Sequence, residues 1–250
     1  MKKQERWKEI LALIKDENEV SVHDLSKHFN VSLATIRRDL LQMEDNSLID
    51  RYHGGAKMNA SGLMEPPMNL KQSTNAAAKN MVARYAARLI KDYQMIYIDA
   101  GSATLEMIDY IVSKNITVVT IGIPHVNKLI AKGINTLLLG GKVRASTMAI
   151  TGNKPVNQLD EYYFDVAFIG SNGIHPISGL TTTNDTEALV KEKAISRSSS
   201  TYVLADHSKF DKILPCTYSK IDDVTIITDT IGNYLGKKPE RCIEVAKIKF

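Results

Sequence analysis

Residues 32–43 read Ser-Leu-Ala-Thr-Ile-Arg-Arg-Asp-Leu-Leu-Gln-Met, and the fold of the N-terminal part of the chain follows from them. The apolar residues of this stretch recur with the 3.6-residue period of an α-helix and share one face: Ile36, Leu40 and Met43. The opposite face carries Ala34, Arg38 and Gln42, flanked by Thr35 and Arg37. Ser32 occupies the N-cap position, where a hydroxyl accepts a backbone N–H of the first turn. The stretch therefore predicts a short helix with an apolar inner face and a cationic outer face.

The residues on either side extend this helix into a larger motif. Ser21 is expected to cap an earlier helix, and residues 30–31 interrupt the helical pattern before Ser32. Two short helices joined by a turn of three or four residues form a helix-turn-helix. A further helix is expected around residues 7–14, and a short hairpin around residues 48–53. Residues 1–57 are therefore predicted to form a winged helix-turn-helix domain.

The outward side chains of the third helix and the hairpin suit the major groove of DNA. Guanidinium groups reach phosphates and guanine edges, and hydroxyls at a helix N-terminus meet phosphates that the helix dipole attracts. We expect Arg38 to contact base edges, Arg37 to lie between groove wall and phosphate, and Asp39 to be a structural partner. The other expected DNA contacts are Ser32, Thr35, Gln42, Arg51, His53 and Lys57. A solvated amphipathic helix is the alternative for the Arg pair, and a structural role is the alternative for His53.

Four motifs of this region together resemble the DeoR family of bacterial transcriptional regulators. They are Glu5-Arg6, Val22-x-x-Leu25-Ser26-x-x-Phe29-x-Val31-Ser32, Thr35-Ile36-Arg37-Arg38-Asp39-Leu40 and Arg51-Tyr52-His53-Gly54-Gly55-Ala56. The resemblance implies that the third helix docks in the DNA major groove and that the protein represses genes for sugar uptake or breakdown. At residues 46–47 the chain has Asn-Ser where the family commonly has a glycine before the wing.

Composition and charge exclude several classes of protein without identifying the function. The formal net charge is +4, but residues 1–57 hold ten Lys or Arg and ten Asp or Glu, and the last 14 residues alone carry +3. An apolar content of 44% indicates a folded globular chain. The sequence shows neither an apolar run of membrane-spanning length nor the apolar core of a signal peptide, and its two cysteines cannot form a disulfide framework. We expect a cytoplasmic protein.

The pattern changes after a proline-containing stretch, residues 58–75, which is expected to be a linker. Short β-rich runs then alternate with segments of helical spacing, which predicts βαβ units and a doubly wound, mostly parallel α/β domain over residues 76–250. The expected strands lie at 95–98, 116–121, 136–139, 166–169, 201–204 and 224–227, and the expected helices at 76–91, 103–113, 124–132 and 184–198. Residues 242–250 alternate apolar and charged side chains and are expected to form an edge strand.

Polar or glycine-rich loops follow four of these strands. They are Asp99-Ala100-Gly101-Ser102-Ala103-Thr104, Gly140-Gly141-Lys142, Gly170-Ser171-Asn172-Gly173 and Ala205-Asp206-His207-Ser208-Lys209-Phe210. Doubly wound sheets bind ligands beyond the carboxyl ends of their strands, and glycine, hydroxyls and helix amides suit a phosphate. The loops therefore predict a polyol-phosphate pocket, with Gly141, Asn172 and Asp206 among its residues.

The resemblance to the DeoR family continues through this half. The motifs include Asp165-x-Ala167-Phe168-Ile169-Gly170, Gly179-Leu180-Thr181-Thr182 and Ala205-Asp206-x-Ser208-Lys209-Phe210. The resemblance implies a sensor domain similar in fold to ribose-5-phosphate isomerase, which binds a phosphorylated sugar or related metabolite. By that likeness the effector site would be lined or bordered by Lys79, Asp99, Gly101, Ser102, Thr104, Glu187, Lys191 and Lys209.

The chain departs from the family pattern at two predicted strand ends. It has Asp99-Ala100-Gly101-Ser102-Ala103 where Asp-x-Gly-Thr-Thr is common, so one hydroxyl is lost. It has Thr120-Ile121-Gly122 where Thr-Asn-Ser is often found, so an apolar side chain replaces a hydrogen-bonding one. Both departures bear on the identity of the effector.

The two halves together predict a sequence-specific DNA-binding repressor of carbohydrate genes that a phosphorylated sugar releases, and not an enzyme. One alternative is a sugar-phosphate isomerase with Asp99, Glu187, Asp206 and Lys209 as acid and base groups, and another is a constitutive repressor with a degenerate sensor. Because winged helices commonly read two half-sites, a homodimer or homotetramer is expected. Neither a metal-ligand spacing nor a nucleotide-cofactor fingerprint is present, so we expect no metal, no cofactor and no membrane partner.

Overall fold

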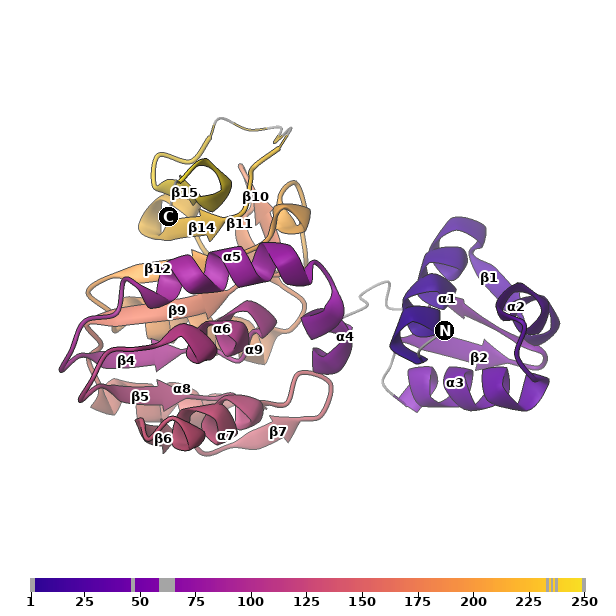
Figure 1. The fold of residues 1–250 in the computed structure, drawn as a ribbon, viewed down its shortest axis with the longest axis horizontal. Coiled ribbons are helices and arrows are strands. Elements are labelled where there is room, and N and C mark those ends of the chain that lie inside the picture. The colour runs from indigo at the N-terminus through magenta and orange to yellow at the C-terminus, as the bar shows by residue number, and fades with distance from the viewer. Residues whose placement is uncertain are drawn as a thin grey trace. The chain divides into compact units, whose positions relative to one another are not determined.

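The structure, a computed structural model, describes residues 3–45, 48–58, 66–232, 234, 236 and 238–248. It separates into two compact units, Met1–Lys71 and Gln72–Phe250 (Figure 1). Four features discussed above lie outside the described residues: Asn46-Ser47, residues 59–65 of the expected linker, two of the cations of the last 14 residues (Lys237 and Lys249), and the last two residues of the expected C-terminal strand.

The N-terminal unit is a winged helix-turn-helix. Its elements are α1 (Lys3–Glu17), β1 (Glu19–Ser21), α2 (Val22–Phe29), α3 (Leu33–Asp45), β2 (Ile49–Tyr52) and β3 (Gly55–Met58). Ser21 caps α2, since its Oγ accepts the backbone N–H of Asp24 at 3.0 Å, and Asn30 ends that helix with a left-handed backbone (φ 51°). The predicted inner face of α3 is completely buried, which confirms the helical pattern. The hairpin expected at residues 48–53 is longer than predicted, since its second strand begins at Gly55, and the wing has a third strand that the sequence did not predict, because β1 pairs with β3 in the antiparallel order β1-β3-β2.

The stretch that was expected to be a linker contains a short helix, α4 (Met68–Ser73). The carbonyl oxygen of Pro67 accepts the backbone N–H groups of Leu70 and Lys71, each at 3.0 Å. A proline before the first turn does not oppose a helix, because the first N–H groups of a helix have no partner within it. The proline pair therefore introduces the helix at this place.

The C-terminal unit is built on a seven-stranded parallel sheet in the order β15-β14-β12-β9-β4-β5-β6. Its strands are β4 (Met95–Ile98), β5 (Thr117–Thr120), β6 (Asn135–Leu138), β9 (Val166–Gly170), β12 (Thr201–Leu204), β14 (Thr225–Thr228) and β15 (Cys242–Glu244). The predicted C-terminal strand is shorter than expected, since a 3-10 turn, η5 (Val245–Lys247), follows β15. The α/β fold class predicted from the alternating pattern is confirmed.

Helices cover both faces of this sheet, which makes it doubly wound (Figure 1). One core packs α5 (Ala76–Ala87), α6 (Ser102–Met107) and α7 (Ile123–Ala131) on one face, through buried residues such as Val82, Leu105 and Leu129. The other core packs α9 (Asp185–Ser196) on the opposite face, together with the 3-10 turn η2 (Leu159–Glu161) that follows α8 (Asn153–Gln158). Successive strand residues alternate between the cores, as a pleated strand requires: Ile96 and Ile98 face the first and Tyr97 the second.

Two small antiparallel sheets flank the main sheet and were not predicted. The first contains β10 (Gly173–His175), β11 (Gly179–Thr182) and β13 (Cys216–Ser219), and the second is the hairpin of β7 (Lys142–Arg144) and β8 (Ala149–Thr151). The chain of β10 leaves directly from the carboxyl end of β9, and that of β7 from the end of β6. Both additions therefore start at the edge of the sheet where a ligand was expected.

Candidate DNA interface and effector site

The outer face of α3 presents its two arginines to solvent. Arg37 and Arg38 are both exposed, and Ser32 and Thr35 share a hydrogen bond of 2.9 Å between their hydroxyl oxygens at the start of the helix. Gln42, at the other end of this face, is half-buried. The arginines are accessible to a DNA backbone or base edge without any rearrangement of the unit.

Asp39 lies on the inner side of the same helix. Its carboxylate pairs with Arg6 of α1, with 2.5 Å between Asp39 Oδ2 and Arg6 Nε, and both side chains are buried. The pair ties α3 to α1, which agrees with the structural role expected of Asp39.

The wing carries further exposed cations. Arg51, His53 and Lys57 are all exposed, and Arg51 also lies 3.5 Å from a carboxylate oxygen of Glu44 at the end of α3. A contact between wing and helix of this kind limits the directions in which Arg51 can extend.

The strand order of the C-terminal unit reverses between β4 and β9, and the loops that leave these two strands meet there. From β4 the chain proceeds to β5 and β6 on one side, and from β9 to β12, β14 and β15 on the other. Gly170, the last residue of β9, donates its backbone N–H to Asp99 Oδ2 at 2.9 Å. Since doubly wound sheets bind ligands at such a switch point, Asp99 lies where a ligand is expected.

Lys191 of α9 completes this cluster. Its ammonium pairs with the Asp99 carboxylate, donates to the Gly170 carbonyl oxygen at 3.0 Å and lies over the Tyr218 ring, 5.6 Å from the centroid. Burial alone would lower the pKa of Lys191, but the Asp99 carboxylate outweighs it, and the pKa lies above its ordinary value. Asp99 is 2% and Lys191 6% exposed. A fully buried ion pair adds little net stability, so its presence at a switch point favours a binding role.

Glu187, one turn before Lys191, faces the β7–β8 hairpin. Glu187 Oε1 accepts the Thr147 hydroxyl at 2.9 Å and lies 3.6 Å from Arg144 Nη1. On β4, the buried Tyr97 hydroxyl has no hydrogen-bond partner. Burial, followed by the charges of Asp99 and Glu187, raises the pKa of Tyr97. Sequence reasoning missed Tyr97, Arg144 and Thr147, because only the folded hairpin brings the latter two to α9.

The loop after β4 is organised from inside by Thr104. Thr104 Oγ1 accepts the Gly101 N–H at 3.0 Å and lies 2.6 Å from the Asp99 carbonyl oxygen and 3.1 Å from His125 Nε2. Thr104 is fully buried, whereas Ser102 is partly exposed. Of the two predicted hydroxyls, Ser102 is therefore the one that a ligand can reach.

Lys79 and Asp206 belong to a neighbouring cluster at the end of β12. The Asp206 carboxylate accepts the Asn75 amide at 2.9 Å and the Ser208 N–H at 3.0 Å, and Lys79 donates to the Thr74 carbonyl oxygen at 2.7 Å. Burial would raise the pKa of Asp206, but the hydrogen bonds from Ser208 and Asn75 and the charge of Lys209 lower it below its ordinary value. The cluster thus holds residues 74–75, which connect α4 to α5.

Two further predicted residues have backbone roles. Gly141 has φ +158°, and a Cβ there would lie 2.7 Å from the Ile150 side chain, so this glycine permits close packing against β8. Asn172 donates its backbone N–H to the Thr181 carbonyl oxygen at 3.2 Å, which joins the end of β9 to β11.

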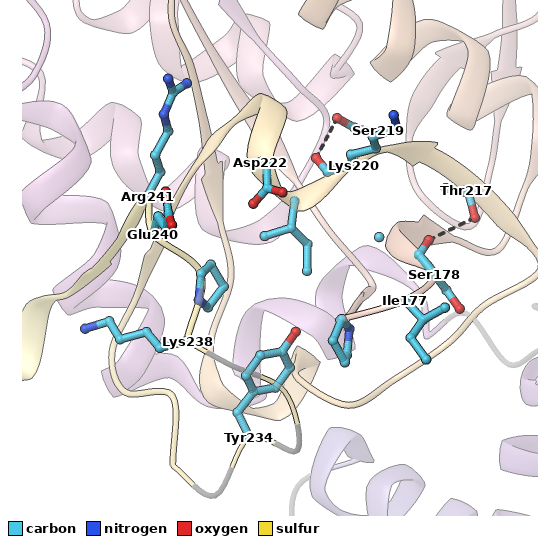
Figure 2. A pocket seen from close by; sticks show the side chains of 14 residues that line it. Ile177, Ser178, Thr217, Ser219, Lys220, Asp222, Tyr234, Lys238, Glu240 and Arg241 are labelled. Atoms are coloured by element: carbon cyan, nitrogen blue, oxygen red, sulfur yellow. Dashed lines mark hydrogen bonds between the residues drawn. The ribbon is translucent and has the colours of Figure 1, made fainter.

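A cavity of about 780 Å³ lies elsewhere on the C-terminal unit (Figure 2). It is lined by the β10–β11 turn, by β13 and by the residues that precede β14 and β15, among them Asp222 and Arg241. Figure 2 shows the Tyr234 ring directed into it, while Lys238 and Arg241 extend away from its centre. This cavity borders the amino ends of β14 and β15, so it is distinct from the predicted site at the carboxyl ends of the strands.

Within the described ranges, no three His, Cys, Asp or Glu side chains are arranged to hold a metal ion. Among the helices of the same ranges, none combines the length and the apolar character needed to cross a membrane.

Two family descriptions match the chain, one to each half. The DeoR-like helix-turn-helix domain matches residues 6–62, and the DeoR C terminal sensor domain matches residues 74–230.

Full-length relatives agree with these matches. A Bacillus subtilis protein named "Uncharacterized HTH-type transcriptional regulator FruR" is 41% identical over 239 residues, which cover 93% of this chain and 95% of that protein. The "HTH-type transcriptional repressor GlcR" of the same species is 30% identical, with 93% and 91% covered. A Staphylococcus aureus "Lactose phosphotransferase system repressor" is 28% identical, with 91% and 92% covered.

Solved structures resemble this chain more remotely. A translation initiation factor eIF-2B from Pyrococcus horikoshii matches with a TM-score of 0.44 and 17% identity, over 85% of this chain and 74% of that one. Ribose 5-phosphate isomerase A from Neisseria gonorrhoeae matches with a TM-score of 0.41 and 17% identity, over 54% of each chain, so this chain spans about half the length of the isomerase. The two domain matches and the full-length relatives together show that this chain belongs to the DeoR family of DNA-binding transcriptional regulators.

Proposed function

We propose that the protein represses genes of carbohydrate metabolism and that a phosphorylated sugar, bound at the switch point of the C-terminal unit, releases it from its operator. The observation that carries the proposal is the buried Asp99–Lys191 pair between the loops of β4 and β9. The printed name of the Staphylococcus aureus relative, a lactose phosphotransferase system repressor, supports the assignment to carbohydrate genes.

The proposed DNA contacts are those of the exposed face of α3 and the wing. Arg38 would contact base edges, and Arg37 would contact the groove wall and a phosphate. Ser32 and Thr35 would donate to phosphates at the start of α3. Gln42, Arg51, His53 and Lys57 complete the proposed set. Two copies of the chain would be needed to read two half-sites, so we propose a homo-oligomer.

The proposed effector site combines charges of both signs in a buried setting. Asp99 and Glu187 can accept hydroxyls of a polyol, while Lys191 and Arg144 supply positive charge for a phosphate. Ser102 and the backbone of Gly101 border the same loop, and Lys79, Asp206 and Lys209 extend the site along the sheet edge. Carboxylates that already accept the Gly170 N–H and the Thr147 hydroxyl are suited to binding rather than to proton transfer.

Substituting Arg38 tests the DNA interface. A duplex that the full-length protein selects from a random pool should bind Arg38→Ala more weakly by about 1–3 kcal/mol, with relaxed preference at one base position, since a bidentate base contact is lost. Fluorescence anisotropy at fixed salt measures the affinity. Lys114→Ala, an exposed cation of the C-terminal unit, is the matched control and should bind as wild type does. Unchanged affinity and preference in Arg38→Ala would remove Arg38 from the interface.

A ligand screen tests the sensor. Ribose 5-phosphate, glucose 6-phosphate and fructose 1-phosphate are compared with the free sugars and inorganic phosphate in thermal unfolding of the full chain. A ligand at a hundredfold excess over its Kd adds about 2.7 kcal/mol to native-state stability. The expected result is a rise in Tm with one phosphorylated sugar, lost in Glu187→Gln, and weaker DNA binding with that sugar. Turnover of any of these phosphates would establish the isomerase alternative instead, and a response to none would favour the constitutive repressor.

A further inference from the structure

His125 lies in the first turn of α7 and is completely buried beside the effector loop. Its Nε2 lies 3.1 Å from Thr104 Oγ1, and Thr104 in turn bonds the backbone at both Asp99 and Gly101. Two hydrogen bonds, through Thr104, therefore connect the imidazole to the backbone of Asp99, the residue at the switch point.

Counting protons around Thr104 assigns the ring its role. The hydroxyl has one proton, and two carbonyl oxygens can accept it: that of Asp99 at 2.6 Å, which is the closer, and that of Gly101 at 2.9 Å. Thr104 Oγ1 itself already accepts the Gly101 N–H at 3.0 Å, so one of its lone pairs remains for a further donor. His125 Nε2 must then carry a proton and donate it, which leaves Nδ1 as a bare nitrogen. Nδ1 is buried and has no hydrogen-bond partner, as this tautomer allows.

The space for the ring is provided by Gly122. A Cβ at this position would lie 2.2 Å from His125 Nδ1 and 2.8 Å from Cγ, closer than real atoms approach. The backbone of Gly122 has φ −91° and ψ 114°, which any residue adopts. Glycine is therefore required here by the imidazole alone and not by the turn.

We propose that His125 is a positioning residue of the effector site: by donating to Thr104 it fixes the Asp99–Gly101 loop, and Gly122 is present to admit its ring. The expected effect of His125 on effector binding rests on the proposed function. The contacts of His125 with Thr104 and Gly122 do not depend on any ligand. His125 itself lies behind the loop and acts on a ligand through Thr104 and Asp99.

The Gly122–His125 relation is tested by a double-mutant cycle on the full-length protein. Gly122→Ala should lower Tm by several degrees when His125 is present, because the methyl group displaces the ring. The same change should have little effect in His125→Ala, where the space is open. Additive effects of the two changes on Tm would overturn the steric part of the proposal.

The positioning role is tested with a pair of variants at residue 125. His125→Leu keeps bulk and loses the donor, while His125→Gln offers an amide N–H near the position of Nε2. In His125→Leu the amide hydrogens of residues 101–104 should exchange with solvent faster, by about tenfold, and in His125→Gln at nearly the wild-type rate. Equal exchange in wild type and His125→Leu would overturn the proposal whether or not any ligand is found.

Binding separates this inference from the proposed function. With the best phosphorylated sugar of the screen as probe, titration calorimetry should show about tenfold weaker binding by His125→Leu and recovery in His125→Gln. Full affinity in His125→Leu would contradict the positioning role. If wild type binds none of the probes, the proposed function fails, and the exchange experiment still decides the role of His125.

Discussion

The protonation state of His125 follows from its surroundings. Burial is the main cause that lowers the pKa of His125; Asp99 and the Gly101 backbone oppose it, the charge of Lys128 adds to it, and the pKa falls from 6.5 to about 4. The ring is therefore neutral in the native protein at neutral pH, as the bare Nδ1 of the assigned tautomer requires. In the unfolded chain the same ring titrates near its ordinary value.

This difference predicts a pH dependence of stability. Between pH 6.5 and 4 the unfolded chain binds a proton that the native state excludes, so the free energy of unfolding falls as pH falls, by about 3 kcal/mol over the whole window. Denaturant unfolding of wild type and His125→Gln at pH 7.5, 6, 5 and 4.5 measures it, and the variant should show the shallower slope. Glu244, whose pKa Lys247 and Lys238 lower to about 2 from an unfolded value of 4.5, adds to the fall at the acid end of this window, but it does so equally in wild type and variant. Parallel slopes in the two proteins would contradict the prediction.

Some residues of the site could be predicted from the sequence around them, and others reach the site only through contacts made in the folded chain. Asp99 follows a strand, so strand-end reasoning and the family resemblance both led to it, whereas Lys191, on a helix, was expected from the resemblance alone. Arg144 and Thr147 are brought to Glu187 by a hairpin that leaves another strand, and no local pattern signals that contact. The departure at Thr120-Ile121-Gly122 was interpreted as an apolar side chain in place of a hydrogen-bonding one; the structure shows in addition that the space beside Gly122 is occupied by the His125 ring.

Among the elements, α3 depends on a polar link as well as on its apolar face. The Arg6–Asp39 pair is buried between α1 and α3, close to the outward arginines. Removing one partner of a buried ion pair leaves the other charge without compensation, which costs far more than the pair itself contributes.

Arg6→Met should therefore destabilise the N-terminal unit by about 3–5 kcal/mol, because the Asp39 carboxylate remains buried alone. Trp7, the single tryptophan, adjoins Arg6 on α1 and reports unfolding of this unit by fluorescence. The matched control Arg37→Ala, on the exposed face, should change stability by less than about 0.5 kcal/mol. Similar unfolding curves for Arg6→Met and wild type would show that the pair is not needed.

Elements with long apolar runs or a clear helical period were predicted from sequence, and short ones were not. The strands β4, β9 and β12 are buried on both faces and stand out as continuous apolar runs. By contrast β1, β7 and β8 have three residues each, and such strands are stabilised by the partner they pair with rather than by their own residues. The helix α4 was also not predicted, because it has only six residues and follows two prolines.

At the scale of the molecule, the start of the C-terminal unit is fastened to the edge of its own sheet. Asn75, with a left-handed backbone (φ 51°), donates to Asp206, and Lys79 donates to the carbonyl oxygen of Thr74. Two residues predicted to serve the effector thus also hold the segment through which the chain enters this unit. A ligand that competes for Asp206 would loosen that segment.

Asn75→Ala should therefore weaken the coupling between effector and DNA. The ratio of DNA affinities without and with the effective sugar phosphate should shrink by about tenfold, since one hydrogen bond to a charged group contributes about 1.5–3 kcal/mol. Affinity for the sugar itself should persist. Ser208→Ala removes a different hydrogen bond to Asp206 and serves as the matched control with normal coupling. An unchanged ratio in Asn75→Ala would exclude this route.

The exposed cations of α3 and the wing lie on a domain whose charges balance only when these cations are counted, since residues 1–57 hold ten of each sign in all. Non-specific attraction to DNA grows with the number of counterions that a protein displaces from phosphates. A neutral domain with a few outward arginines displaces few of them on random sequence. We therefore expect the salt dependence of non-specific binding to follow the number of these outward side chains and not the net charge of the chain.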